Sequence, residues 1–208
     1  MRVALLGPLE LETGGSALGP RDRLVLAALA MRRGMWMGAD ALADALWPDQ
    51  PPASWQKVVQ GCVSRLRRVL GPESIETSPS GYRLRTEWVE LDVVELEDLV
   101  ARARSGLAEG AAERAVAGFE KALGLWRGRP LTELEEWPPA QLEAARLTEL
   151  HLAAEEERLT AMLAAGRHHE VVAEALVQAR EQPWRESRWA TLALAQYRCG
   201  RQHRARLD

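Results

Sequence analysis

The first ninety residues carry two kinds of hydrophobic pattern. Apolar residues stand at every second position in 3–5 and 9–11, and the alternation resumes at 17–18 after the segment TGGS (13–16). Such runs around a Gly-Gly pair predict short antiparallel strands. From residue 21 the period becomes helical, and helices are predicted over 21–33, 38–47 and 54–70. A second alternating run over 75–86, with Ser80-Gly81 at its turn, predicts a β-hairpin.

After residue 91 the pattern is helical throughout, with amphipathic segments over 91–107, 111–126 and 139–166 and further helices beyond. Gly166-Arg167 recurs as Gly200-Arg201 after 34 residues, the period of tetratricopeptide repeats. Ala175 and Ala179 allow the close helix contacts that such repeats need. The predicted fold is therefore mostly α with small β elements, comprising a winged helix-turn-helix domain over 1–90 and an all-α, tetratricopeptide-like domain over 91–208.

The helix over 54–70 has one apolar side and one cationic side. At about 100° per residue, its apolar residues fall together, and the opposite side carries Lys57, Gly61, Ser64, Arg65 and Arg68, flanked by Gln60 and Arg67. A solvated helix face normally mixes charge signs, but this face has no acidic residue. A glycine at position 61 also lowers helix stability by about 1 kcal/mol relative to alanine. Its presence on this side indicates that another group must approach the helix closely here. The order of three helices and a hairpin is that of a winged helix, whose third helix enters the DNA major groove.

Composition is compatible with this interpretation. Residues 1–90 hold 11 Lys and Arg against 10 Asp and Glu, and the remaining residues hold 16 against 20. Cys62 and Cys199 have no metal-ligand spacing and indicate a reducing, cytoplasmic setting. The N-terminus lacks the pattern of a secretory signal, and the longest apolar run (24–31) is too short to span a bilayer. We expect no membrane association.

No catalytic or cofactor-binding pattern stands out. Ser54 and Lys57 match S-x-x-K, but the companion motifs of serine enzymes are missing. His168 and His169 lie where a repeat turns, which favours surface positions over metal ligands. We therefore expect neither an enzyme nor a bound cofactor or metal.

Five segments carry a family resemblance: VALLGPLEL (3–11), LADALWPDQPPAS (42–54), VSRLRRVLG (63–71), GYRLR (81–85) and ALGLWRGRPLTEL (122–134). In this order they resemble the antibiotic regulatory protein (SARP) family. These actinobacterial transcriptional activators join an OmpR-type winged helix to a tetratricopeptide-like bacterial transcriptional activation domain. The resemblance covers essentially the whole chain.

The resemblance implies binding to double-stranded DNA at direct repeats near a promoter, with side-by-side protomers that recruit RNA polymerase, and control of antibiotic biosynthesis genes. It places Arg65 on a base and Lys57 and Arg67 on phosphates. Expected DNA contacts are Lys57, Gln60, Gly61, Ser64, Arg65, Arg67 and Arg68 on the helix and Thr77, Ser80, Tyr82 and Arg83 in the wing. Expected polymerase contacts are Trp47, Asp49 and Gln50 in the loop before the third helix.

Family members continue beyond the point that corresponds to Asp208, which falls eight residues into the last predicted helix. We therefore expect a truncated repeat. The alternative function is a tetratricopeptide-type protein-interaction module that does not bind specific DNA. A salt-sensitive affinity for heparin would favour the DNA-binding function.

Overall fold

The computed structural model describes residues 1–12 and 18–200, which divide into two compact units. The first unit combines Met1–Leu96 with Leu125–Glu149, and the second combines Glu97–Gly124 with the chain from Leu150 onward. The predicted Gly-Gly turn at 13–16 and the residues from 201 to 208, with the last predicted helix, lie outside the described residues. Within those residues, no helix is long and apolar enough to cross a membrane.

A small three-stranded sheet begins the first unit. Its strands are β1 (Arg2–Ala4), β2 (Glu10–Leu11) and β5 (Glu90–Leu91), in the order β2-β1-β5. The antiparallel pairing expected at the N-terminus is confirmed, with Val3 opposite Leu11. The parallel partner, which sets Leu91 opposite Val3, was not predicted because two residues carry no readable alternation.

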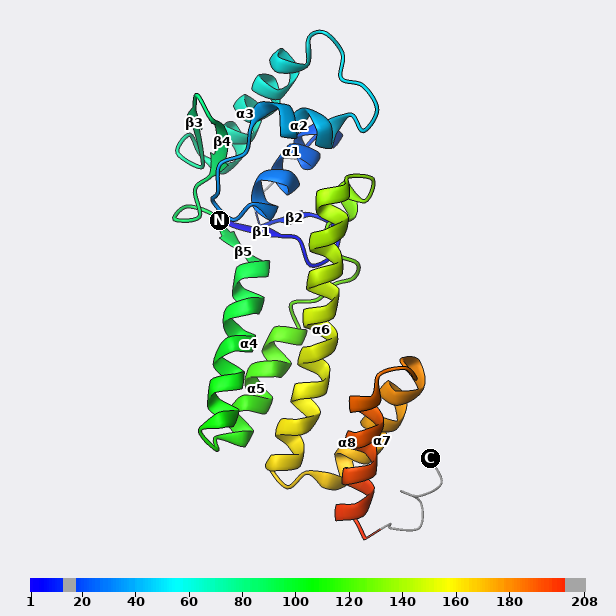
Figure 1. Cartoon of the computed structure of the whole chain (residues 1–208). Coiled ribbons are helices and arrows are strands. Elements are labelled where there is room, and N and C mark those ends of the chain that lie inside the picture. Colours follow the sequence, from blue (N-terminus) through cyan, green and yellow to red (C-terminus); the bar gives the residue numbers. More distant parts are fainter. Residues whose placement is uncertain (13–17, 201–208) are drawn as a thin grey trace. The chain divides into compact units, whose positions relative to one another are not determined.

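Three helices and a hairpin complete the winged-helix pattern, in the predicted order (Figure 1). The helices are α1 (Pro20–Met31), α2 (Ala39–Leu46) and α3 (Trp55–Leu70), and the hairpin is β3 (Ile75–Ser78) with β4 (Gly81–Leu84). The fully buried side chains at its centre include Leu26, Leu29, Leu42, Leu66 and Leu84. Leu42 and Leu66 lie on the faces that their helices were predicted to bury. Because α1, α2, α3 and β4 share this core, it fixes the angle at which α3 is presented.

The segment from Leu125 to Glu149 also belongs to the first unit. Its amides at Arg127 and Leu131 donate to the carbonyls of Leu6 (2.7 Å) and Leu5 (3.1 Å). The Glu133 carboxylate, in the 3-10 turn η1 (Thr132–Leu134), accepts from the Leu9 amide at 2.8 Å. Residues more than a hundred positions apart thus hold the connection between β1 and β2 in place.

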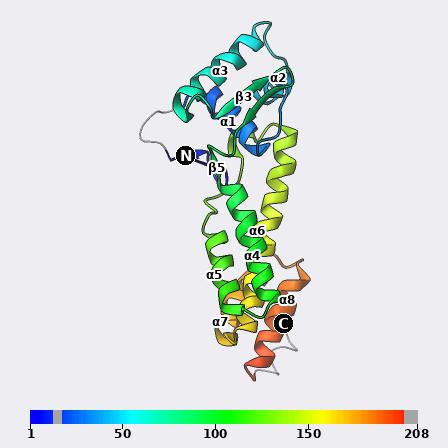
Figure 2. The same ribbon diagram turned by 90° about the vertical axis from the view of Figure 1, so that its left-hand side faces the viewer.

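In its described residues, the second unit contains helices and no strands. It draws on α4 (Asp92–Ala108), α5 (Ala112–Leu123), α6 (Pro138–Ala164), α7 (His168–Glu181) and α8 (Glu186–Arg198). Helices α7 and α8 pack side by side (Figure 2). Gly166 and Gly200 both have left-handed backbone angles (φ 82° and 73°), so the turn that ends α6 recurs 34 residues later after α8. This recurrence supports the predicted tetratricopeptide-like arrangement.

A buried arginine ties three helices of this unit together. Arg188 on α8 is only 1% exposed and donates to the Gln178 carbonyl at 2.9 Å. It also donates to Glu155 (2.9 Å) and Glu156 (3.1 Å) on α6. Because every arm of the guanidinium meets an acceptor, its burial is compensated.

Candidate nucleic-acid interface

The third helix presents a polar stripe along its whole length. Val59, Cys62, Val63, Leu66 and Leu70 are buried, as predicted, while Trp55 and Val69 are half-buried. On the opposite side Lys57, Gln60, Ser64 and Arg68 are exposed. Their spacing of three, four and four residues keeps them on one face for three helical turns, about 16 Å at 1.5 Å per residue. Within the described part of the chain, no carboxylate pairs with Lys57 or Arg68.

Arg65 lies beside this stripe and is held by a carboxylate of α1. Its Nε donates to both oxygens of Asp22 (3.1 and 2.9 Å) and its Nη2 to Oδ1 (2.8 Å). Nη2 also contacts the Cys62 Sγ at 3.2 Å. The Asp22 side chain is 7% exposed and that of Arg65 is 49% exposed. The guanidinium is therefore gripped on one side, while Nη1 has no hydrogen-bond partner among the described residues.

Two pKa shifts follow from this cluster. Burial alone would raise the pKa of Asp22, but the hydrogen bonds from Arg65 and Cys62 and the charge of Arg65 hold it below its ordinary value. Burial, reinforced by Asp22, raises the pKa of the Cys62 thiol to about 11. Asp22 is therefore ionised at neutral pH, and Cys62 stays a protonated thiol rather than a nucleophile.

Arg67, expected on a phosphate, connects α3 to the wing. Its Nε and Nη2 donate to the Ile75 carbonyl (3.0 and 2.8 Å), and Nη2 also donates to Thr77 Oγ1 (2.7 Å). Two expected DNA contacts, Arg67 and Thr77, are thus brought together by a bond between them. The bond also fixes the first strand of the wing relative to the helix.

The wing is anchored at its turn by a glycine. Tyr82 exchanges both backbone hydrogen bonds with Met37, at 2.9 and 2.8 Å. A Cβ on Gly81 (φ 122°) would lie 2.0 Å from the Met37 carbonyl oxygen, so only glycine allows this approach. Tyr82 itself is 8% exposed, which places its ring in the packing beneath the wing rather than on its surface.

The surface of the wing carries two of the predicted residues. Ser80 is exposed at the turn, where its hydroxyl lies 3.0 Å from that of Ser78. Arg83 donates to Glu76 at 2.8 and 2.6 Å, and its guanidinium lies 4.8 Å from the centre of the Trp36 ring. Both lie on the same hairpin as Thr77, so the wing presents Thr77 close to α3, Ser80 at its tip and Arg83 on β4.

The loop before α3 lies in the same unit. Trp47 directly follows α2, and Arg21 stacks over its ring at 5.7 Å. Asp49 and Gln50 are exposed. A hollow of about 340 Å³ lies between the start of α2, Trp55 and the tip of the wing. Of the three expected polymerase contacts, Asp49 and Gln50 are therefore exposed, whereas Trp47 is half-buried.

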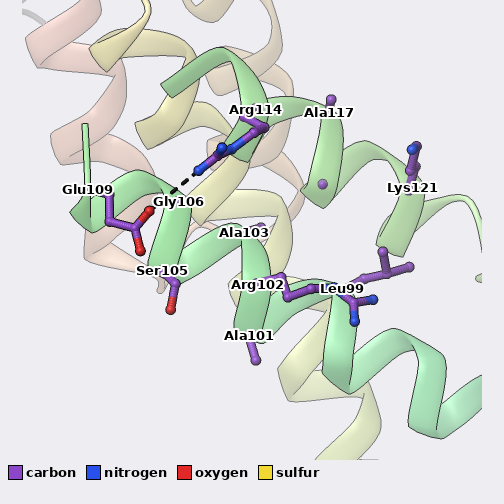
Figure 3. Close-up of a pocket in the computed structure, with 11 residues that line it drawn as sticks. Leu99, Ala101, Arg102, Ala103, Ser105, Gly106, Glu109, Arg114, Ala117 and Lys121 are labelled. Atoms are coloured by element: carbon purple, nitrogen blue, oxygen red, sulfur yellow. Dashed lines mark hydrogen bonds and ion pairs between the residues drawn. The ribbon is translucent and has the colours of Figure 1, made fainter. Parts of the chain in front are cut away.

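The second unit has a larger hollow between α4 and α5, of about 570 Å³ (Figure 3). Its floor is formed by small side chains where the two helices approach closely: a Cβ on Gly118 would lie 3.0 Å from that of Ala103. Arg114 pairs with Glu109 at 3.4 Å at one end. Its lining contains one carboxylate, Glu109, and one hydroxyl, Ser105, but no histidine or cysteine. Among the described residues, no group of three or more His, Cys, Asp and Glu side chains could hold a metal ion.

Asp22, which pairs with Arg65, is a residue of this interface that sequence reasoning missed. It is a buried carboxylate in the first turn of a helix whose neighbouring positions are Arg21 and Arg23. An isolated acid there is typical of a residue that favours the helix dipole. Its pairing with Arg65 spans 43 positions and follows only from the packing of α1 on α3.

Two family models match the chain. Residues 14–84 match "Transcriptional regulatory protein, C terminal" and residues 91–206 match "Bacterial transcriptional activator domain". Regulatory protein DnrI of Streptomyces peucetius is 31% identical over 219 residues, covering 99% of this chain and 80% of that protein. Regulatory protein AfsR of Streptomyces griseus is 35% identical over 208 residues. The chain spans only 21% of AfsR.

A solved structure is similar over nearly the whole chain. The structure of Mycobacterium tuberculosis EmbR in complex with a low-affinity phosphopeptide matches with a TM-score of 0.89 and 31% identity. The match covers 98% of this chain and 56% of the EmbR chain. The similarity includes both the winged-helix pattern and the helical region that follows it.

Proposed function

The chain belongs to the antibiotic regulatory protein (SARP) family of transcriptional regulators, which join an OmpR-type DNA-binding domain to a bacterial transcriptional activator domain, and on that premise we propose that it is a sequence-specific DNA-binding activator. In this proposal α3 lies in the major groove and the β3–β4 wing contacts the neighbouring phosphate backbone. Its relatives are regulators and not enzymes.

The observation that carries the proposal is the exposed face of α3. Lys57 and Arg68 mark its two ends, and Gln60 and Ser64 lie between them. The carboxylate that contacts this helix, Asp22, is buried behind Arg65 and offers little repulsion to a phosphate. Lysine and serine suit phosphate oxygens, whereas arginine and glutamine suit the acceptors and donors of base edges.

The proposed roles follow from the contacts that each side chain already makes. Arg65 reads a base through Nη1, since Nε and Nη2 are held by Asp22. Lys57 and Arg68 neutralise phosphates, and Arg67 adds its remaining nitrogen while holding the wing. Thr77, Ser80 and Arg83 face the backbone of the DNA, and Tyr82 supports them from below. Gly61 leaves room beside Arg65.

The remaining parts of the proposal concern the partners. We infer a DNA-binding domain over residues 1–90 and an activation domain over 91–208. Side-by-side protomers occupy direct repeats near promoters, in the cytoplasm. The loop with Trp47, Asp49 and Gln50 contacts RNA polymerase, and the controlled genes belong to antibiotic biosynthesis. Support for these parts comes from family membership and from the exposure of the loop.

The rival proposal is a tetratricopeptide-type interaction module without specific DNA binding. The helical second unit and the hollow between α4 and α5 favour a protein partner for that region. They do not account for the exposed polar stripe on α3, whose Lys57 and Arg68 have no carboxylate partner in the described part of the chain. Nor do they account for a wing that is bound to α3 through Arg67. The DNA-binding proposal accounts for both.

Selection from a pool of randomised duplexes tests the proposal directly. The full chain should enrich one sequence, and repeated copies of that sequence should bind more tightly than a single copy. The logarithm of the affinity should fall linearly with the logarithm of the salt concentration. If no sequence is enriched and binding to all duplexes is equal, the chain is not a sequence-specific regulator and the interaction module becomes the better description.

A further inference from the structure

We propose that Asp22 of α1 is a positioning residue for DNA recognition, which holds Arg65 so that its Nη1 is presented above Gly61 toward a base edge. This inference rests on the proposed function and adds to it a residue outside the recognition helix. The carboxylate does not touch DNA. It acts through the arginine that it grips.

The first step is the geometry of the grip. Three hydrogen bonds of 2.8 to 3.1 Å engage Nε and Nη2, which is the side-on mode of pairing between arginine and a carboxylate. Nη2 is further held by the Cys62 sulfur at 3.2 Å. With one edge of the planar group fixed at two nitrogens, the guanidinium cannot rotate about its own axis. Nη1 therefore points in a single direction without any DNA present.

The second step is the burial of Asp22, which makes the grip firm. The carboxylate is 7% exposed and lies at the start of α1, whose remaining residues from Val25 to Ala30 form the core. A backbone hydrogen bond from Gly19 further favours its ionised form. An exposed ion pair is weakly ordered, whereas this one has a buried and fixed acceptor. Arg65 thus loses little rotamer freedom when it meets a base, and the preference for the correct base is larger.

The third step is the glycine on the recognition helix. A Cβ on Gly61 would lie 3.3 Å from Nη1 of Arg65, and apart from its chain neighbours and the backbone of α3 no other heavy atom would come within 4 Å of it. The close group expected at this position is therefore the guanidinium of the same helix, one turn further along. A methyl group there would displace Nη1 by a few tenths of an ångström while leaving the helix intact.

A structural role for Asp22 makes a different prediction. If the carboxylate only stabilised the fold, its loss would lower binding to every sequence by the same factor. If it acted only through its charge, its loss would strengthen binding to all DNA, because a negative group would leave the neighbourhood of the phosphates. Only a role that acts through Arg65 changes the preference at one base pair, and a positioning role lowers that preference when the carboxylate is lost.

The experiment measures binding of the full chain to the selected site and to its single-base variants, for wild type, Arg65→Ala, Asp22→Asn and Gly61→Ala. Asp44→Asn is the matched control, because it removes the same charge from an exposed position on α2. Thermal unfolding of each variant is recorded in parallel. We expect Asp22→Asn to reduce the preference at the position read by Arg65 by about tenfold, with binding to random DNA unchanged or stronger.

Gly61→Ala should reduce the same preference, although alanine favours the helix and the variant should unfold at the same or a higher temperature. Asp44→Asn should leave every preference as in wild type. Together, Asp22→Asn and Gly61→Ala separate recognition from folding. Gly61→Ala stabilises the helix and should still lose discrimination between base pairs.

Several outcomes would overturn the inference. A uniform loss in Asp22→Asn across all base variants makes the residue structural, and a stronger preference makes it a brake that withholds Arg65 from DNA. If Arg65→Ala flattens one position while both Asp22→Asn and Gly61→Ala keep it, the inference fails and the proposed function stands. If the wild-type chain shows no base preference at all, the proposed function itself fails.

Discussion

At the scale of single residues, the cationic side chains proposed to contact DNA differ in the contacts that they make within the protein. Arg65 is fixed by a buried carboxylate, Arg67 by the wing, and Arg83 by Glu76 and the Trp36 ring. Lys57 and Arg68 extend into solvent. The three held arginines can contact DNA only with their guanidinium groups in one orientation. Lys57 and Arg68 can change rotamer to reach a nearby phosphate. The distinction separates positions that affect specificity or folding from positions that affect only affinity.

Replacing Lys57 by alanine should weaken binding to all duplexes and lower the slope of log affinity against log salt by about 0.9, because one phosphate contact is lost. The unfolding temperature of Lys57→Ala should not change.

Arg67→Ala should also weaken binding to all duplexes, but it should lower the free energy of unfolding by roughly 1–2 kcal/mol, since the Ile75 carbonyl and Thr77 lose their donor. Titrations at several salt concentrations, with calorimetry, measure both effects. Equal stability of the two variants would show that Arg67 does not hold the wing.

His151 on α6 gives the second unit a predictable response to acid. Burial lowers its pKa from 6.5, against the opposing attraction of Glu155. In the unfolded chain it binds a proton below pH 6.5, whereas in the fold it resists protonation to lower pH. Stability should therefore fall as the pH drops below 6.5. Unfolding temperatures between pH 7.5 and 5 should show a smaller fall for His151→Gln than for wild type, and exposed His169→Gln should behave as wild type. Identical slopes for all three would refute this assignment.

At the scale of elements, the helices and the hairpin follow from local pattern, and the contacts between them do not. The amphipathic period predicted α3 and its buried face because Val59, Cys62 and Leu66 recur with the helical repeat. By contrast, β5 has two residues, and its partner β1 is almost ninety positions away. The stripe on α3 was likewise visible from the sequence, whereas the Asp22–Arg65 pair depends on how two helices pack.

The wing offers a sharp test at this scale. Gly81→Ala would place a methyl group 2.0 Å from the Met37 carbonyl and also force φ 122° on a residue with a Cβ. We expect a loss of roughly 2–4 kcal/mol and detachment of the wing from residue 37. Gly71→Ala is the matched control, since its φ is 99° but no atom beyond its chain neighbours would lie within 4 Å of the new Cβ. Denaturant unfolding compares the two. If both variants lose the same amount, backbone strain alone accounts for the effect and the contact with Met37 does not.

At the scale of the whole molecule, the compact units do not follow the chain in two consecutive blocks. The first unit includes Leu125–Glu149, which follows α4 and α5 in the sequence. Asp92 is buried under the N-terminal sheet, where its carboxylate accepts the amides of Leu5 (2.8 and 2.9 Å) and Leu6 (2.9 Å). Sequence reasoning placed the proposed DNA contacts within residues 1–90, and all of them lie in the first unit. It could not place the later segment, because no local pattern connects Glu133 with Leu9.

A fragment ending at residue 90 therefore retains the proposed DNA contacts but loses part of its support. The amides of Leu5, Leu6 and Leu9 lose the carboxylates of Asp92 and Glu133, and unsatisfied buried groups cost about 1–3 kcal/mol each. We expect the fragment to unfold about 10 °C or more below the first unit of the full chain, with fast exchange of these amides. Asp92→Ala in the full chain should reproduce the fast amide exchange at Leu5 and Leu6 alone.

Below its unfolding temperature, the fragment that ends at residue 90 should select the same DNA sequence as the full chain and bind repeated sites less tightly. It should fail to stimulate transcription in a reconstituted assay, because residues 91–208 are proposed to supply the protein contacts. Slow exchange at all three amides would show that Asp92 and Glu133 do not stabilise the sheet, and full activation by the fragment would show that the helical part is not the activating element.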